Sequence, residues 1–357
     1  MSARLILSSL LAAALVALPL RASAETGVTD GPKGVVANPA NGKAYAVFPE
    51  YGFVKILHGD SVKVLKTGVN VKDLTLDPAS GKVYAMNRGP GTVSAIDPVS
   101  DEVSATIPAN RGSLTALNPR TGKLYVSAST GTDPSVVDLA TGASTVIRAG
   151  TEGNALSVNP QKNEIYFVGY EDNFLTIVDG ATLTPRRLPV PGWHQWDSAF
   201  NEKTGQLYIP SPNDNAVMVI DTRDNDRVSV IGTGKSPVAA AVDRAANRVY
   251  VVNYESSDVT VIDAGTNRAV ATVAVGLWPQ QLAVNEKTGR VYVANTHADS
   301  VSVLDGKAAK VIATVPAGDG PWALAVDPAA DKIYVANRAG GGTVTVIDGR
   351  TNSAVQR

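Results

Sequence analysis

Short apolar segments, separated by small and polar residues, follow one another along the chain after residue 25. In one stretch, predicted strands cover residues 281–284, 291–294, 300–304 and 310–315, and Gly, Asn and Asp lie between them. Segments of this length, rich in Val, Ile and Tyr and bounded by turn residues, are typical of antiparallel β-hairpins. No helical periodicity is found in this region. The pattern therefore predicts an all-β protein.

One Tyr recurs at nearly constant spacing, with gaps of 39, 41 and 41 residues and then 42 four times. The eight positions are Tyr45, Tyr84, Tyr125, Tyr166, Tyr208, Tyr250, Tyr292 and Tyr334. Four strands in a repeat of roughly 42 residues are typical of a β-propeller blade. We predict one propeller domain over residues 25–357 with eight blades; seven blades plus an irregular N-terminal unit is the alternative. Because the last strand, residues 353–356, is short, residues 25–30 are a candidate partner strand for ring closure.

The repeated polar residues suit turns better than catalysis, because a catalytic residue need occur only once. An Asp ends the third strand of seven repeats, where its carboxylate can accept backbone N–H groups two residues on. We expect the Asn that ends the second strand of four repeats to act in the same way. The repeated Tyr should fill the space between sheets, with its hydroxyl near a partner. These sets are Asp97, Asp138, Asp179, Asp221, Asp263, Asp305 and Asp348, and Asn87, Asn253, Asn295 and Asn337.

Residues 1–24 have the pattern of a cleaved secretory signal. Arg4 precedes an apolar run from Leu5 to Leu18, and Ala22-Ser23-Ala24 offers the small residues of a cleavage site. The run is too short for a comfortable membrane span. With no Cys in the chain, a lipoprotein anchor, a disulfide and a c-type haem attachment are all excluded. We expect a periplasmic or secreted protein, not inserted in a membrane after signal removal.

The three last repeats carry a family resemblance. Tyr250-Val251-Val252-Asn253, Tyr292-Val293-Ala294-Asn295 and Tyr334-Val335-Ala336-Asn337 resemble the tetrapeptide that names the YVTN-type β-propeller repeats of exported bacterial proteins. The resemblance is looser in the first five repeats. It implies a propeller fold in an exported or surface protein and brings no shared catalytic motif.

Loops at one end of a propeller axis join strand four to the next strand one and strand two to strand three. All four Trp fall in the first set, and several Arg, His and Tyr fall in the second. Exposed aromatic rings beside basic groups around an axial opening predict a binding surface. Its candidate residues are Trp193, His194, Trp196, Trp278, Trp322, Tyr254, His297, Arg88 and Arg338, with Arg111, Lys235, Tyr170, Glu171 and Glu255 nearby.

Each Trp also has a structural interpretation, in which it caps a blade core or plugs the channel mouth. Trp278 and Trp322 are expected at matching repeat positions, which favours that interpretation for them. Trp193, His194 and Trp196 replace the usual Gly-x-x-Pro text in one blade only, and a departure confined to one copy favours function. His297 alone is expected to be an ordinary loop residue.

Three functions fit this sequence. The first is a non-enzymatic binding or scaffolding propeller, monomeric and without a cofactor, that recognises a protein segment, a glycan or a short single-stranded nucleic acid. The second is a lactonase-type propeller hydrolase that uses an axial metal, although the scattered His residues form no linear metal motif. The third is a redox accessory, disfavoured because no Cys and few His are present. The formal net charge is −1 and becomes −3 once Arg4 and Arg21 are removed, which argues against general binding of polyanions.

Overall fold

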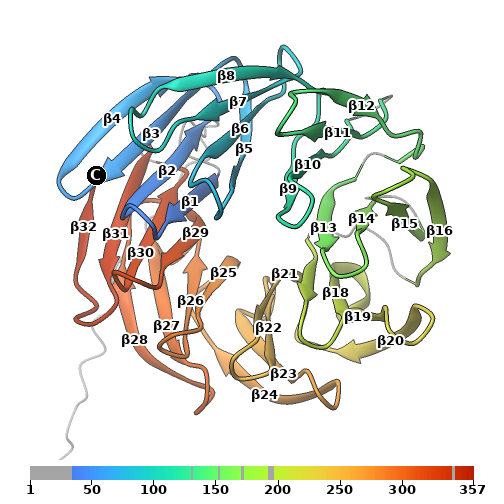
Figure 1. Cartoon of the computed structure of the whole chain (residues 1–357). Coiled ribbons are helices and arrows are strands. Elements are labelled where there is room, and N and C mark those ends of the chain that lie inside the picture. Colours follow the sequence, from blue (N-terminus) through green and yellow to red (C-terminus); the bar gives the residue numbers. More distant parts are fainter. Residues whose placement is uncertain (1–33, 130–131, 152, 170–172, 192–196, 340–341) are drawn as a thin grey trace, which may run out of the picture.

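The structure is a computed structural model that describes residues 34–129, 132–151, 153–169, 173–191, 197–339 and 342–357. In these residues, 32 strands form eight antiparallel four-stranded sheets, arranged as blades in a ring (Figure 1). The predicted all-β, eight-bladed propeller is confirmed, and the seven-blade alternative is wrong. The described part of the chain contains one helical segment, the 3-10 helix η1 (Pro212–Asp214). None of its helical structure has the length and apolarity needed to span a bilayer.

The strands of each blade are consecutive in the sequence. Blades 1 and 2 contain β1 (Gly34–Asn38), β2 (Lys43–Phe48), β3 (Phe53–His58), β4 (Ser61–Lys66), β5 (Val71–Leu76), β6 (Val83–Asn87), β7 (Thr92–Ile96) and β8 (Val103–Pro108). Blades 3 and 4 contain β9 (Thr115–Asn118), β10 (Lys123–Val126), β11 (Ser135–Asp138), β12 (Ser144–Val146), β13 (Ala155–Asn159), β14 (Glu164–Val168), β15 (Phe174–Asp179) and β16 (Pro185–Pro189).

The second half of the chain repeats this order. Blades 5 and 6 contain β17 (Ala199–Asn201), β18 (Gln206–Ser211), β19 (Ala216–Asp221), β20 (Arg227–Gly232), β21 (Pro237–Asp243), β22 (Arg248–Asn253), β23 (Asp258–Asp263) and β24 (Arg268–Ala274). Blades 7 and 8 contain β25 (Pro279–Asn285), β26 (Arg290–Asn295), β27 (Ser300–Asp305), β28 (Lys310–Pro316), β29 (Pro321–Asp327), β30 (Lys332–Asn337), β31 (Thr343–Asp348) and β32 (Ala354–Gln356).

The first strand of every blade lies at the axis. Each first strand contacts the first strand of the next blade, and β29 contacts β1, so these strands enclose the axis completely. Burial changes from strand to strand: β2, β18 and β26 are almost entirely buried, whereas β4, β12 and β32 are largely exposed. Each blade therefore buries its middle strands against neighbouring blades and presents its fourth strand at the rim.

The repeated Tyr joins neighbouring blades. Its ring lies in the second strand and is at most 5% exposed in every repeat. Tyr45 of blade 1 belongs to the same apolar cluster as Val71 and Leu74 of blade 2. Tyr166 donates a hydrogen bond to Glu164 and Tyr208 to Gln206, each over 2.9 Å. The predicted position between sheets is therefore confirmed, as is the hydroxyl partner for these two.

The ring closes through the same kind of contact. Tyr334 of blade 8 packs with Ala44, Ala46 and Leu57 of blade 1, and Arg357 forms an ion pair with Asp60. Blade 8 has four strands of its own, because β32 pairs with β31. Residues 25–30, the candidate partner strand, lie outside the described residues, as does the predicted signal segment.

The Asp that ends the third strand fixes the following turn, as the sequence predicted. In Asp138, Oδ1 accepts the backbone N–H groups of Ala140 and Thr141, both over 3.0 Å. These bonds hold the pKa of Asp138 below its ordinary value. The other six accept at least one equivalent bond: Asp97, Asp179, Asp221, Asp263, Asp305 and Asp348.

The Asn that ends the second strand has a different role from the one expected. Asn295 donates from Nδ2 to the hydroxyls of Ser300 and Ser302, over 3.2 and 2.9 Å, and so ties the second strand to the third. Asn87, Asn253 and Asn337 make the equivalent bond to Ser94, Thr260 and Thr345. The amide lies against a Gly of the preceding loop, since a Cβ on Gly276 would be 2.6 Å from the Asn295 amide.

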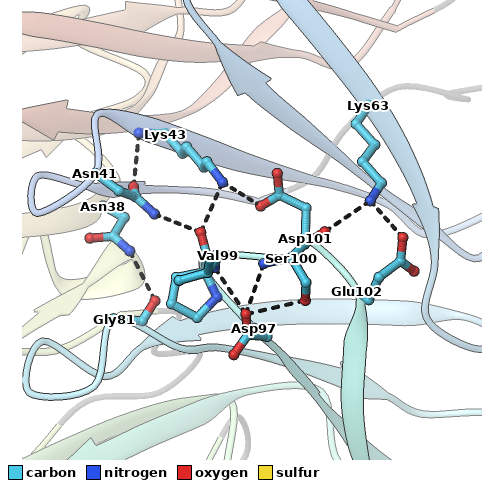
Figure 2. Close-up of polar contacts among 11 residues, drawn as sticks. Asn38, Asn41, Lys43, Lys63, Gly81, Asp97, Val99, Ser100, Asp101 and Glu102 are labelled. Carbon is cyan, nitrogen blue, oxygen red and sulfur yellow. Dashed lines mark hydrogen bonds and ion pairs between the residues drawn. The ribbon is translucent and has the colours of Figure 1, made fainter.

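Polar contacts between turns add a second link between blades. Figure 2 shows Lys43 of blade 1, whose Nζ donates to Asp101 over 2.7 Å and to the Pro98 carbonyl over 2.8 Å in blade 2. Lys63 likewise reaches Glu102. In later blades Arg248 and Arg290, which also begin the second strand, donate to the carbonyls of Gly306 and Gly349.

Replacement of Gly276 by Ala should destabilise the fold, because the added methyl group would overlap the buried amide of Asn295. We expect the free energy of unfolding to fall by about 1–3 kcal/mol in urea titrations. Gly232→Ala is the matched control, since a Cβ there meets no atom within 4 Å, and it should change stability by less than about 0.5 kcal/mol. Equal effects in both variants would contradict this account of the Gly.

Candidate functional site

Two sets of loops meet at one end of the axis. In four blades, the residue four positions after the repeated Tyr donates its backbone N–H to the carbonyl of the residue directly before the first strand. The pairs are Arg88 to Asn70, Tyr254 to Ser236, Thr296 to Trp278 and Arg338 to Gly320, at 2.9–3.2 Å. These bonds place the two loops of each blade on one axial face.

An aromatic cluster lies on this face between blades 6 and 7. The Trp278 ring centroid is 5.3 Å from that of Tyr254 and 3.9 Å from that of His297. Trp278 remains 41% exposed, and its neighbour Leu277 is also exposed. His297, which lies in the loop after β26 as expected, is therefore part of an aromatic surface. We call Tyr254, Trp278 and His297 the blade 6–7 cluster.

The backbone of Trp278 is left-handed, with φ of 51°. Asn70, Ser236 and Gly320 occupy the same place before the first strand and are also left-handed. A bulky side chain is disfavoured there, at a cost of order 1–3 kcal/mol. The fold tolerates this cost at Trp278, whose ring lies on the protein surface.

Trp322 occupies a different repeat position from Trp278. It follows Pro321 inside β29, whereas Trp278 precedes Pro279 and β25. Pro279 pairs with Asn295 and Pro321 with Asn337, so the repeat equivalent of Trp322 is Gln280. The expectation of matching positions is therefore wrong.

Trp322 and Arg338 form a second aromatic group on the face. The guanidinium carbon of Arg338 lies 4.4 Å from the centroid of the Trp322 ring, a cation–π arrangement. The Arg338 backbone is held by its bond to Gly320. Both side chains are half-buried. The pair thus presents a ring in a fixed orientation beside the axis.

An axial cavity of about 550 Å³ opens among the first strands. Its polar lining combines two carboxylates, two amides and a hydroxyl with the rings of Tyr254 and Trp322, and none of the described lining residues is basic. The lining residues are Asp73, Leu114, Thr115, Ala155, Leu156, Asp197, Val238, Ala239, Tyr254, Gln280, Gln281, Trp322 and Ala323.

Asp73 and Asp197 are the two carboxylates of the cavity. Asp73 Oδ2 accepts from the backbone N–H and hydroxyl of Thr115 in the next blade, over 2.7 and 2.9 Å. Asp197 accepts the backbone N–H groups of Ser198 and Ala240, over 2.8 and 3.1 Å. An ionised carboxylate has about four acceptor positions, so each keeps capacity for a ligand.

Burial raises the pKa of both carboxyl groups, and that of Asp197 reaches about 6. The hydrogen bonds from backbone N–H groups oppose this rise without cancelling it. Sequence reasoning missed both residues. The signal was available, because they stand eleven residues before Tyr84 and Tyr208, where the other blades have Gly34, Leu114, Ala155, Ala239, Gln281 and Ala323.

The remaining predicted residues do not join this cavity. Arg88 and Arg111 line a separate hollow between blades 2 and 3, and Lys235 and Glu255 are exposed on their loops. Trp193, His194, Trp196, Tyr170 and Glu171 lie outside the described residues. Among the residues that are described, no group of three or more His, Cys, Asp or Glu is placed to hold a metal ion.

Comparison with solved structures gives the same fold. Apo AztD from Citrobacter koseri superposes with a TM-score of 0.60 at 15% identity, covering 82% of this chain and 88% of that one. Kuenenia stuttgartiensis hydrazine synthase gives 0.59 at 15% identity, covering 93% and 99%. At this identity the likeness shows the propeller fold alone. No protein-family model and no curated protein matches the chain.

The left-handed backbone at Trp278 gives a test by substitution. Trp278→Gly should be more stable than Trp278→Ala by about 1 kcal/mol, because Gly adopts positive φ without strain. Trp322 lies in β29 at the register shift between Pro321 and Ala323, and its backbone is not left-handed, so the order should reverse there, with Ala more stable than Gly. Chemical denaturation of the four variants measures both differences. The same order at both positions would show that the left-handed backbone of Trp278 carries no strain.

The raised pKa of Asp197 predicts a pH dependence. The pKa of Asp197 is raised from its ordinary value of 3.8 to about 6. At a pH between these two values, the folded state holds a proton that the unfolded state has released. Stability from this group is therefore lost as pH rises through that window. Asp197→Asn should gain stability relative to the unmodified protein from pH 4 to pH 7, by at most about 3 kcal/mol.

Asp138→Asn is the control, because the pKa of Asp138 lies below 3.8 and its contribution changes only at lower pH. Denaturation at a series of pH values measures both differences. A flat profile for Asp197→Asn between pH 4 and pH 7 would show that this carboxyl is not desolvated.

Proposed function

We propose that this chain is an exported, non-enzymatic β-propeller of the YVTN type that binds a glycan at the axial face. The observation that carries the proposal is the lining of the axial cavity, where carboxylates and amides alternate with aromatic rings. Export is supported by the signal pattern of residues 1–24. The YVTN assignment is supported by the tetrapeptides of the last three repeats.

The chemistry of the cavity suits a carbohydrate. Sugar hydroxyls can donate to Asp73, Asp197 and the amide oxygens of Gln280 and Gln281. The C–H face of a sugar ring can stack on Tyr254 or Trp322, since aromatic rings carry a negative face. A volume of about 550 Å³ falls within the usual range of small-ligand pockets, roughly 300–1,000 Å³.

The same features make the other two ligand classes less suitable. A nucleic acid would bring phosphates towards Asp73 and Asp197, where like charges repel strongly at low dielectric. An extended protein segment needs a groove or a long free strand edge, whereas this site is a cavity of about 550 Å³ surrounded by the first strands of the blades. A glycan end requires neither.

Hydrolysis is the second candidate function, favoured by the two desolvated carboxyl groups in one cavity. A carboxyl with a pKa of about 6 is suited to general acid–base catalysis near neutral pH, and carboxylate pairs are the usual machinery of glycoside hydrolysis. If this function holds, the protein should turn over a glycoside or sugar lactone, and Asp197→Asn should abolish turnover.

Binding is tested by calorimetric titration of the mature protein with neutral cell-wall oligosaccharides, sugar lactones and single-stranded oligonucleotides. We expect saturable binding of an oligosaccharide, weakened at least about tenfold by Trp322→Ala because one stacking contact is worth about 1–3 kcal/mol. Tyr51→Ala is the matched control, an exposed ring at 55% that does not line the cavity. Preference for the oligonucleotide, or oligosaccharide binding unchanged in Trp322→Ala, would refute the proposal.

A further inference from the structure

The hollow between blades 2 and 3 has a chemistry of its own. Its volume is about 440 Å³, and its lining contains two Arg, two hydroxyl residues and an amide: Asn70, Arg88, Gly89, Arg111, Ser129 and Thr132. None of these described lining residues is a carboxylate. The axial cavity, by contrast, has two carboxylates and no basic residue in the part of its lining that the structure describes. The two hollows therefore favour ligands of opposite charge.

Neither guanidinium group has a counter-ion among the residues that the structure describes. Within the described residues, neither Arg88 nor Arg111 forms a side-chain hydrogen bond, an ion pair or a ring contact. Asp133, a carboxylate of the adjoining β10–β11 loop, is engaged elsewhere, since it accepts from Gly150 N–H over 3.0 Å and lies 3.6 Å from Arg148. Two Arg that share a hollow without a carboxylate repel each other until an anion enters.

The backbone under both Arg is fixed. Arg88 donates its N–H to Asn70, and the next residue, Gly89, donates to Val69, over 3.1 and 3.2 Å. The carbonyl of Arg111 accepts the Ser129 hydroxyl over 2.6 Å, and the Arg111 N–H donates to Asn110 over 2.7 Å. Each guanidinium therefore projects from an anchored loop, which lowers the entropic cost of binding.

The repeat itself does not require these residues. Blades 6 and 7 have Gly-x-x-Pro at 16 to 13 residues before the repeated Tyr, whereas blade 3 has Ala109-Asn110-Arg111-Gly112 there. Arg88 stands four residues after Tyr84, where the other blades have Pro49, Ser129, Tyr170, Pro212, Tyr254, Thr296 and Arg338. Arg88 and Arg111 each depart from the repeat, and the two departures lie side by side at the junction of blades 2 and 3.

We propose that Arg88 and Arg111 form an anion-binding site for a phosphate or carboxylate group, separate from the axial cavity. Arg offers paired N–H donors that match either group, and the amide of Asn70 in the lining can add a further hydrogen bond. Phosphate and carboxylate share this chemistry, so the ligand is either a phosphate-bearing molecule or an acidic sugar.

Calorimetric titration at constant ionic strength tests the site, with inorganic phosphate and glucuronate as probes. We expect saturable binding of one probe, weakened at least about tenfold in Arg88→Gln and in Arg111→Gln, since hydrogen bonds to charged groups contribute about 1.5–3 kcal/mol. Preference for phosphate would indicate a phosphate-bearing ligand, and preference for glucuronate an acidic sugar.

Arg268→Gln is the matched control, because Arg268 is exposed on β24, and it should bind as the unmodified protein does. Trp322→Ala should also keep its anion affinity, so that failure of the glycan proposal and failure of this one are distinguished. Thermal unfolding of the Arg variants should be nearly unchanged, because neither guanidinium forms a hydrogen bond or ion pair with the described residues. The proposal would be overturned if neither probe bound saturably, or if the double variant Arg88→Gln/Arg111→Gln bound as tightly as the unmodified protein.

Discussion

The architecture depends on one contact, the packing of each repeated Tyr into the core of the following blade. A four-stranded sheet cannot bury both of its faces alone, and the Tyr ring of the second strand closes the gap to the next sheet in every repeat. Loss of one such buried aromatic ring typically costs about 3–5 kcal/mol. Because Tyr334 makes the contact with blade 1, the same interaction builds the blades into a ring and closes it.

This rigid ring leaves the loop ends free to differ. The repeated Tyr is present in all eight blades and the turn Asp in seven, whereas the loops and first strands that face the axis vary from blade to blade. There the chain places acidic and aromatic groups in the axial cavity and basic groups in the hollow of blades 2 and 3. One face thus carries two hollows of opposite electrostatic character on a nearly neutral protein, a separation that net charge alone conceals.

The Tyr spacing was enough to predict the fold, the eight blades and the turn role of residues such as Asp138, because these features repeat and each repeat supports the others. Trp278, Tyr254 and His297 were recognised as surface candidates from the sequence. Their mutual stacking depends on the left-handed backbone of Trp278, which could not be predicted from the residue type. Asp73 and Asp197 were missed because each looks like an ordinary strand residue until the repeats are aligned on the Tyr. Their meeting in one cavity is set by ring geometry, which brings together blades that are far apart in sequence.

The exposed fourth strands have a consequence for behaviour at high concentration. Each ends its sheet with an unpaired row of backbone N–H and C=O groups, and β-branched residues such as Val230, Val270 and Ile312 stand exposed along these rows. Such edges are templates for intermolecular pairing. The chain limits that hazard by interrupting the edges with charges and prolines, as in Pro185-Arg186-Arg187-Leu188-Pro189 of β16. The colloidal stability of the protein is therefore decided at its rim, far from either hollow, and can be improved there by polar substitutions that leave the ligand-binding end intact.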